Sequence, residues 1–261
     1  MRVFRLSLLF VLLTLLCWLA PRAAGGAIRE EVADKYEGRY REWKEEFLST
    51  ETGRGQWELY DRSTHFTLTI TVSADNRHGG ETGKYKWDDS GELVAATIVL
   101  GCRIDEGFPN PVYYPVMNSL SLAESSCATG GDVLAAAKIA HEFGHVKQAA
   151  GADGVLYRLQ NQLMPAYNKI LLANGRDTRD PRLMELARRM GGTPVEIWED
   201  REYWGEANAM LYLRDRFSRE GVRCELFHRI RRSVELYAKN YAGRFAAIAQ
   251  SGPPPYLCAW Q

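Results

Sequence analysis

The stretch that most constrains the fold is DVLAAAKIAHEFGHVKQAA, residues 132–150. Apolar residues recur along it at helical spacing and glycines border it, so the pattern predicts a helix. His141 and His145 are four residues apart, which places both side chains on one face of that helix. Ile139 and Phe143 fall on the opposite side and predict an apolar stripe for packing. We therefore expect the histidine face and the packing face to be separate.

Two imidazoles on one helical face can hold one zinc ion, each at about 2.0–2.1 Å. Glu142 is displaced by one residue from His141, so its carboxylate flanks the metal and can accept a proton from a water that the metal activates. The competing interpretation is two histidines that face solvent on an ordinary helix. We favour a zinc site with His141 and His145 as ligands, because the chain has only five histidines and two of them share this face.

A catalytic zinc ion keeps three protein ligands and a water, so a further ligand is expected. The residues after His145 are VKQAAGADG, and the only later histidine is His228. We therefore expect a carboxylate ligand on a later helix. The best candidates lie in the segment DREYWGEANA, residues 200–209.

Within that segment, REYWGEA, residues 201–207, resembles the second motif of gluzincin metallopeptidases in the Arg-Glu-Tyr-x-Ala-Asp-Ala form of the HtpX-like branch. The resemblance implies that Glu202 binds zinc, that Gly205 lets two helices approach, and that Glu206 orients a ligand histidine. This chain has Glu206 where the family has aspartate. If the family motif is instead aligned with its ligand glutamate at Glu206, then Glu206 binds the metal and Ala209 is the small residue three positions later. The resemblance covers only the two motif helices.

The residues before the histidine helix predict a small sheet. An alternating, β-branched run indicates a strand over 66–72, and a second strand is expected over 92–104. A third, over 112–117, contains a proline that favours an edge position. Ahead of these strands, apolar residues at helical spacing predict an amphipathic helix over 29–48.

Helices dominate the second half of the chain. After the histidine helix we predict helices over 155–174, 181–190, 194–219 and 222–249. Strands followed by helices is the order of an α+β protein. Together with the resemblance, this order leads us to expect one zincin-like metallopeptidase domain over 28–261. Its sheet-bearing lobe and metal helix would reach to about 150, with a helical lobe over 151–261.

The start of the sequence has the character of a secretory signal peptide, which we predict over 1–27. Two arginines precede an uncharged run over 6–20, and small residues follow that run. The run is shorter than the roughly 20 residues of a membrane-spanning helix, so no stable membrane insertion is expected after cleavage. We expect a secreted or periplasmic protein.

Four cysteines follow the predicted signal peptide: Cys102, Cys127, Cys224 and Cys258. An even number in an exported chain predicts two disulfides, and we prefer the pairs Cys102–Cys127 and Cys224–Cys258. Their spacing does not form CxxC pairs, which argues against a thiolate zinc site. The 33 basic and 33 acidic residues balance, which argues against a nucleic-acid partner.

These features predict an exported zinc metallopeptidase that acts on a peptide or protein substrate, with Glu142 as general base. Two alternatives stay open: a secreted binding or structural module that keeps zinc for stability, and a zinc hydrolase of a non-peptide amide. His228 and Tyr212 are candidates for a donor that stabilises the transition state. By analogy with zincins, a strand over 93–104 or 112–117 would hold an extended substrate.

Overall fold

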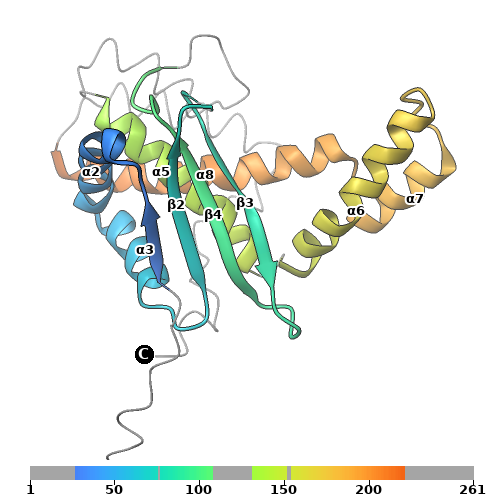
Figure 1. The fold of residues 1–261 in the computed structure, drawn as a ribbon, viewed down its shortest axis with the longest axis horizontal. Coiled ribbons are helices and arrows are strands. Elements are labelled where there is room, and N and C mark those ends of the chain that lie inside the picture. Colours follow the sequence, from blue (N-terminus) through green and yellow to red (C-terminus); the bar gives the residue numbers. More distant parts are fainter. Residues whose placement is uncertain (1–26, 76, 108–130, 152–153, 221–261) are drawn as a thin grey trace, which may run out of the picture.

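A computed structural model describes residues 27–75, 77–107, 131–151 and 154–220 (Figure 1). Along these residues one strand and two helices are followed by three strands and four helices, which confirms the α+β class. The strand predicted over 112–117 and the helix predicted over 222–249 lie outside the described residues. So do residues 1–26 of the predicted signal peptide. In the described part of the chain, no helix combines the length and the apolar composition of a membrane span.

The four described strands form one mixed sheet in the order β1-β2-β4-β3. Their bounds are Ile28–Glu31 for β1, Thr67–Ser73 for β2, Gly80–Trp87 for β3 and Leu93–Gly101 for β4. β1 and β4 run parallel to β2, and β3 pairs antiparallel with β4. β2 and β4 confirm the strands predicted over 66–72 and 92–104. β3 forms one edge of the sheet as described, and β4 is internal.

Two helices precede the second strand, and four follow the fourth. Their bounds are Asp34–Ser49 for α2, Glu51–Asp61 for α3, Asp132–Ala150 for α5, Gly154–Ala173 for α6, Pro181–Met190 for α7 and Pro194–Glu220 for α8. The last four confirm the predicted helices to within one residue at each end. The sequence pattern predicted no element at α3 or β3. The helix predicted over 29–48 begins only at Asp34, because residues 28–31 pair with β2 as a strand.

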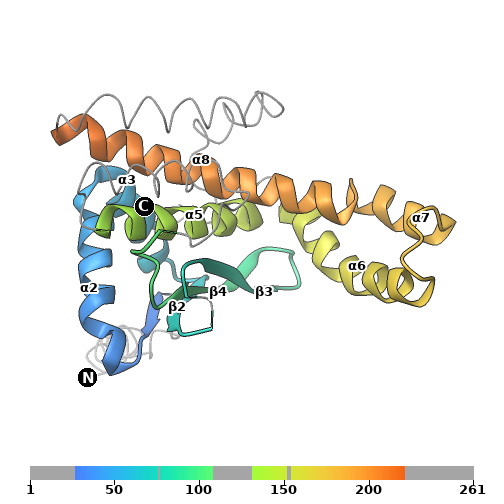
Figure 2. The same ribbon diagram turned by 90° about the horizontal axis from the view of Figure 1, so that it is seen from above.

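The histidine-bearing helix α5 lies between the sheet and α8 (Figure 2). Phe143 points into the main core, where its ring packs against Phe47 and Tyr60, as the predicted apolar stripe requires. The histidine face and the packing face are separate, as expected, because His141 and His145 lie toward α8, and the histidine face is buried as well. The reason is that α8 covers the histidine side of the helix. The candidate site is therefore an interior site between two helices.

The region formed by α6, α7 and the first turn of α8, residues 154–198, projects beyond the sheet in both views (Figures 1 and 2). We call it the arm, and the rest of the described chain the body. The arm has its own small core, made of Tyr167, Leu183, Met190 and Ile197. α8 continues from the arm into the body, so one helix connects the two regions.

Candidate metal centre

The backbones of α5 and α8 approach closely where each helix has a glycine. A Cβ atom on Gly144 would lie 2.7 Å from the carbonyl oxygen of Trp204, and one on Gly205 would lie 2.5 Å from Nε2 of His141. Neither distance leaves room for a methyl group. The glycines therefore set the distance between the helices, which is the role that the sequence resemblance implies for Gly205.

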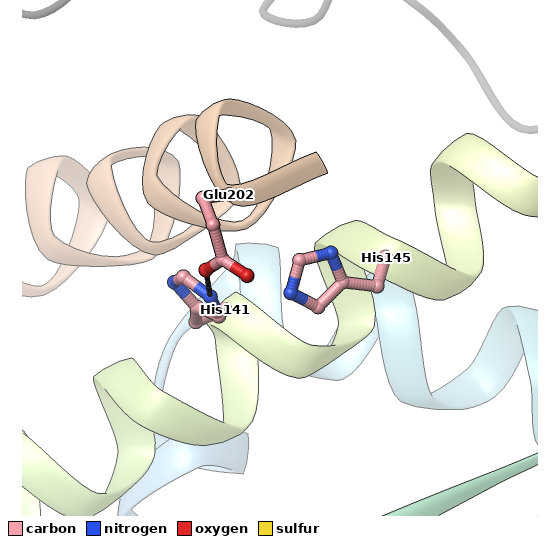
Figure 3. A group of neighbouring side chains, drawn as sticks. All are labelled: His141, His145 and Glu202. Atoms are coloured by element: carbon pink, nitrogen blue, oxygen red, sulfur yellow. Dashed lines mark hydrogen bonds and ion pairs between the residues drawn. The ribbon is translucent and has the colours of Figure 1, made fainter. Parts of the chain in front are cut away.

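His141 and His145 on α5 point toward Glu202 on α8 (Figure 3). One ligand atom from each of the three lies within 4.8 Å of the other two, and all three residues are buried. Nε2 of His141 is 3.2 Å from Oε2 of Glu202. Two ligands of a tetrahedral zinc ion lie about 3.3 Å apart when each is about 2.0 Å from the metal. These three residues could hold a metal ion, and they are the only such group in the described ranges.

Glu206 lies on the other side of the His141 ring. Its Oε1 is 3.3 Å from Nδ1 of His141, and the side chain is 1% exposed. One ring nitrogen of His141 thus faces Glu202, and the other faces Glu206. A carboxylate behind a metal-binding histidine fixes the orientation and tautomer of its ring. The geometry favours this supporting position for Glu206 over the alternative in which Glu206 is itself a ligand.

Glu142 is buried beside the same group and contacts the edge of the sheet. Thr82 on β3 donates a hydrogen bond from Oγ1 to Oε2 of Glu142 over 2.6 Å. Burial raises the pKa of Glu142 to about 7, although the positive field of His141 and the Thr82 hydrogen bond oppose this rise. A carboxyl group with a pKa near neutrality can both accept and release a proton, which suits a general base.

The two histidines have opposite pKa shifts. Burial lowers the pKa of His145 to about 3, with a further contribution from His141, so the ring is neutral and has a lone pair for a metal. Burial also acts to lower the pKa of His141, but its hydrogen bonds with Glu202 and Glu206 outweigh burial and raise the pKa. His141 therefore holds a proton that a metal ion would have to displace.

Several residues near the site belong to no recognisable motif, so the sequence did not single them out. In β3 the pairing register shifts between Gly83 and Lys86, and Lys84 has a φ of 50°. This bulge keeps Tyr85 on the same side of the sheet as Thr82, since an extra residue reverses the alternation of side chains. The hydroxyl of Tyr157 on α6 donates to that of Tyr85 over 2.9 Å. Burial raises the pKa of both tyrosines, and the negative charge of Glu142 adds to the rise, so both hydroxyls lie within its field.

Three expectations for the surroundings of the site have different outcomes. The prediction that Tyr212 donates to a substrate is wrong. Its hydroxyl donates a hydrogen bond to Oε1 of Glu46 on α2 over 3.0 Å. The other candidate, His228, lies outside the described residues. The substrate strand proposed over 93–104 corresponds to β4, whose backbone already pairs with β2 and β3. β4 therefore cannot accept an additional strand.

The disulfide predictions cannot be compared with the fold. Cys102 forms no disulfide with any described residue. The preferred partner Cys127 and the second pair, Cys224 and Cys258, lie outside the described ranges. Both disulfides stay predictions.

Comparison of the chain with models of protein families, with curated proteins and with solved structures finds no match. Function must therefore be inferred from the site itself. The features that bear on it are the buried group of His141, His145 and Glu202, the carboxylate behind His141, and the neighbouring Glu142.

Proposed function

We propose that the protein is an exported zinc-dependent peptidase with a zincin-like domain of the gluzincin type. The observation that carries the proposal is the convergence of His141 and His145 on α5 with Glu202 on α8, in one buried group beside Glu142. Two imidazoles and one carboxylate form a known ligand set of catalytic zinc. The group contains no cysteine, which is in keeping with an open catalytic centre rather than a closed structural one.

Each residue of the site has a distinct task in this proposal. A zinc ion bound there would polarise a water molecule and the scissile carbonyl. Glu142 accepts the proton of the attacking water and passes it to the leaving amine. Glu206 holds the His141 ring through Nδ1, so that Nε2 faces the ligand group.

Edge strand β3 supports a peptide as the substrate class. It pairs with β4 on one side only, and no described strand pairs with its other side. The strand also contacts Glu142 through Thr82. An extended peptide could therefore add to β3 by main-chain hydrogen bonds and lie near the general base. In this proposal β3 takes the role that we expected of the strand over 93–104.

Two other functions compete with this proposal. A binding or structural module that keeps zinc for stability needs the three ligands but has no use for a buried Glu142 held by Thr82. A zinc hydrolase of a non-peptide amide would use the same residues, and it differs in not needing the edge of β3.

The test is digestion of a diverse peptide library by the exported protein, combined with measurement of bound zinc and iron. Iron is included because two histidines and a carboxylate also bind Fe(II). We expect zinc to be present, cleavage to stop with a chelator, and cleavage to return with added zinc. Cleavage that continues in the chelator would refute the proposal. Bound zinc without any hydrolysis would support the module, and hydrolysis of small amides alone would support the third function.

Glu142→Gln is the matched variant for this experiment. The amide cannot accept the proton, so kcat should fall by about 10²–10⁴-fold, the usual contribution of a general base. Zinc content should stay at the parent level because Glu142 is not in the ligand group. A variant that cleaves at the parent rate would show that Glu142 is not the base.

A further inference from the structure

The hydroxyl of Thr82 contacts both the side chain and the backbone of Glu142. Its Oγ1 lies 2.6 Å from Oε2 of the carboxylate and 3.1 Å from the carbonyl oxygen of the same residue. A hydroxyl has one proton to donate, and the shorter contact to the carboxylate is the geometry of a strong, charge-assisted hydrogen bond. One threonine side chain thus connects the edge strand to the residue that the proposed reaction needs as its base.

Gly80 borders the other carboxylate oxygen. A Cβ atom at this position would lie 2.4 Å from Oε1 of Glu142 and 2.8 Å from its Cδ. Gly80 and Thr82 are two residues apart in one strand, so both are on the side of β3 that faces α5. The Glu142 carboxylate therefore lies between the Thr82 hydroxyl and a stretch of backbone without a side chain.

The pairing of the strands fixes the position of these two residues. Thr82 pairs with Ile98 and Gly80 pairs with Leu100, and both of these β4 residues are buried in the main core. The edge strand cannot shift by one residue without moving Thr82 to the other side of the sheet. The position of the Glu142 carboxylate is thereby coupled to the core of the body.

We propose that Thr82 is a positioning residue for Glu142, and that Gly80 provides the space in which the carboxylate is held. The inference rests on the proposed function for its effect on catalysis. A glutamate side chain has three rotatable bonds, and a small displacement of a reacting group can cost about 100-fold in rate. The Thr82 hydrogen bond restricts this freedom on the side of the sheet, while α5 fixes the backbone.

Three variants test this role. Thr82→Val removes the hydroxyl and keeps the shape, whereas Thr82→Ser keeps the hydroxyl. The control is Thr97→Val on β4, which makes the same exchange on the side of the sheet turned away from the core. We expect Thr82→Val to lower kcat by about 10–100-fold with KM changed less than about twofold. Thr82→Ser should recover most of the rate, and Thr97→Val should match the parent. Zinc content should be equal in all four proteins.

Two outcomes would overturn the role of Thr82. One is a Thr82→Val variant with the parent kcat, and the other is an equal loss in Thr82→Val and Thr82→Ser, which would show that the hydroxyl is not responsible. Gly80→Ala provides an independent variant. It should also lower kcat with zinc retained, because the methyl group would displace Oε1.

Crystal structures of the parent and of Thr82→Val separate this inference from the proposed function. If the parent cleaves no peptide, the proposed function fails. The positioning role is then decided by the Glu142 carboxylate alone. A carboxylate that moves or becomes disordered in Thr82→Val supports the inference, and one that keeps its place refutes it.

Discussion

The body and the arm are both largely helical, but they bury their side chains very differently. In the body, α5 is covered on all sides, and even its polar residues Lys138 and Gln148 are buried. In the arm, four residues form the core, and six large apolar side chains are exposed: Val155, Leu156, Leu172, Met184, Val195 and Trp198. The candidate metal centre lies in the body. A site that must hold three ligand atoms in place depends on dense packing, which the body provides. The looser packing of the arm does not bear on the positions of these atoms.

The α8 helix connects the two regions and makes the comparison testable. Ile197 contributes to the core of the arm, and Glu202 on the next turn contributes to the ligand group in the body. If the regions are independent, changes in the arm should leave metal binding intact. If α8 transmits structural changes from the arm to the body, changes in the arm should also weaken metal binding.

The largest effect is expected from changes to the two acidic residues of α8 in the body. Glu202→Ala should deplete the protein of zinc, because it removes one of three ligands. Glu206→Ala removes only the carboxylate behind His141 and should cost about 10–100-fold in zinc affinity. Dialysis of both variants against the same weak chelator, followed by a zinc assay, shows which variant loses more zinc. The opposite order would show that Glu206 is the ligand.

A change in the core of the arm tests its independence. Leu183 is fully buried there, so Leu183→Ala should cost about 2–5 kcal/mol of the stability of the arm. Hydrogen exchange should become faster in α6 and α7, while zinc affinity stays within about twofold of the parent value. The matched control is Leu68→Ala in the body, also fully buried. Loss of zinc affinity in Leu183→Ala would mean that arm and body unfold as one unit.

A smaller effect is expected where the two helices of the site cross. Gly144→Ala should destabilise the protein by about 1–3 kcal/mol, the range of an overpacked core, because its Cβ would meet the backbone of α8. Gly38→Ala on α2 is the control, since a Cβ there has no neighbour within 4 Å. That change should stabilise the helix by about 0.5–1 kcal/mol. Urea unfolding of the two variants gives the comparison, and equal effects would contradict the close approach of α5 and α8.

A further expected effect is a pH dependence of zinc binding. The raised pKa of His141 means that its pair with Glu202 must lose a proton when zinc binds. The apparent affinity for zinc should therefore rise with pH, by about tenfold per pH unit over the range in which that proton is bound. Zinc titrations between pH 6 and 8 measure this slope. An affinity that does not change with pH would show that His141 is already neutral.

The histidines also give the metal-free protein a pH-dependent stability with a defined sign. His145 has a folded pKa of about 3, below the ordinary histidine value of 6.5, so its contribution to stability is present above pH 6.5 and is lost as pH falls toward 3. His141 has a folded pKa above 6.5, so its contribution is present below 6.5 and is lost as pH rises through the folded value. Thermal unfolding of metal-free protein across this range should show the acid loss. If the stability of His145→Ala does not fall at acidic pH, the fall seen in the parent protein is due to His145.

Elements with local signals could be predicted from sequence. The bounds of α7 follow from Asp180, which caps the amide of Arg182, from Pro181 in the first turn, and from Gly191 with a φ of 77° at the end. The pair His141 and His145 is equally local, because helical spacing alone places both on one face.

Elements that depend on distant partners could not be predicted. β3 contains two glycines and a bulge, and its place is set by pairing with β4 and by contact with α5. Thr82 and Glu142 are 60 residues apart in the chain, so no spacing rule relates them. α3 contains Gly53 and Gly55, which are weak helix formers. Gly53 is needed because a Cβ there would lie 1.9 Å from the carbonyl oxygen of Phe47.

The metal centre is tested most directly by X-ray absorption at the zinc edge of the zinc-loaded protein. We expect two imidazole nitrogens and one carboxylate from the protein, with nitrogen and oxygen neighbours at about 2.0–2.2 Å. In Glu202→Ala, any remaining zinc should lose the carboxylate and keep the imidazole signal of His141 and His145. Sulfur neighbours at about 2.3 Å, or a spectrum without imidazole, would show that zinc binds elsewhere and would contradict the proposed centre.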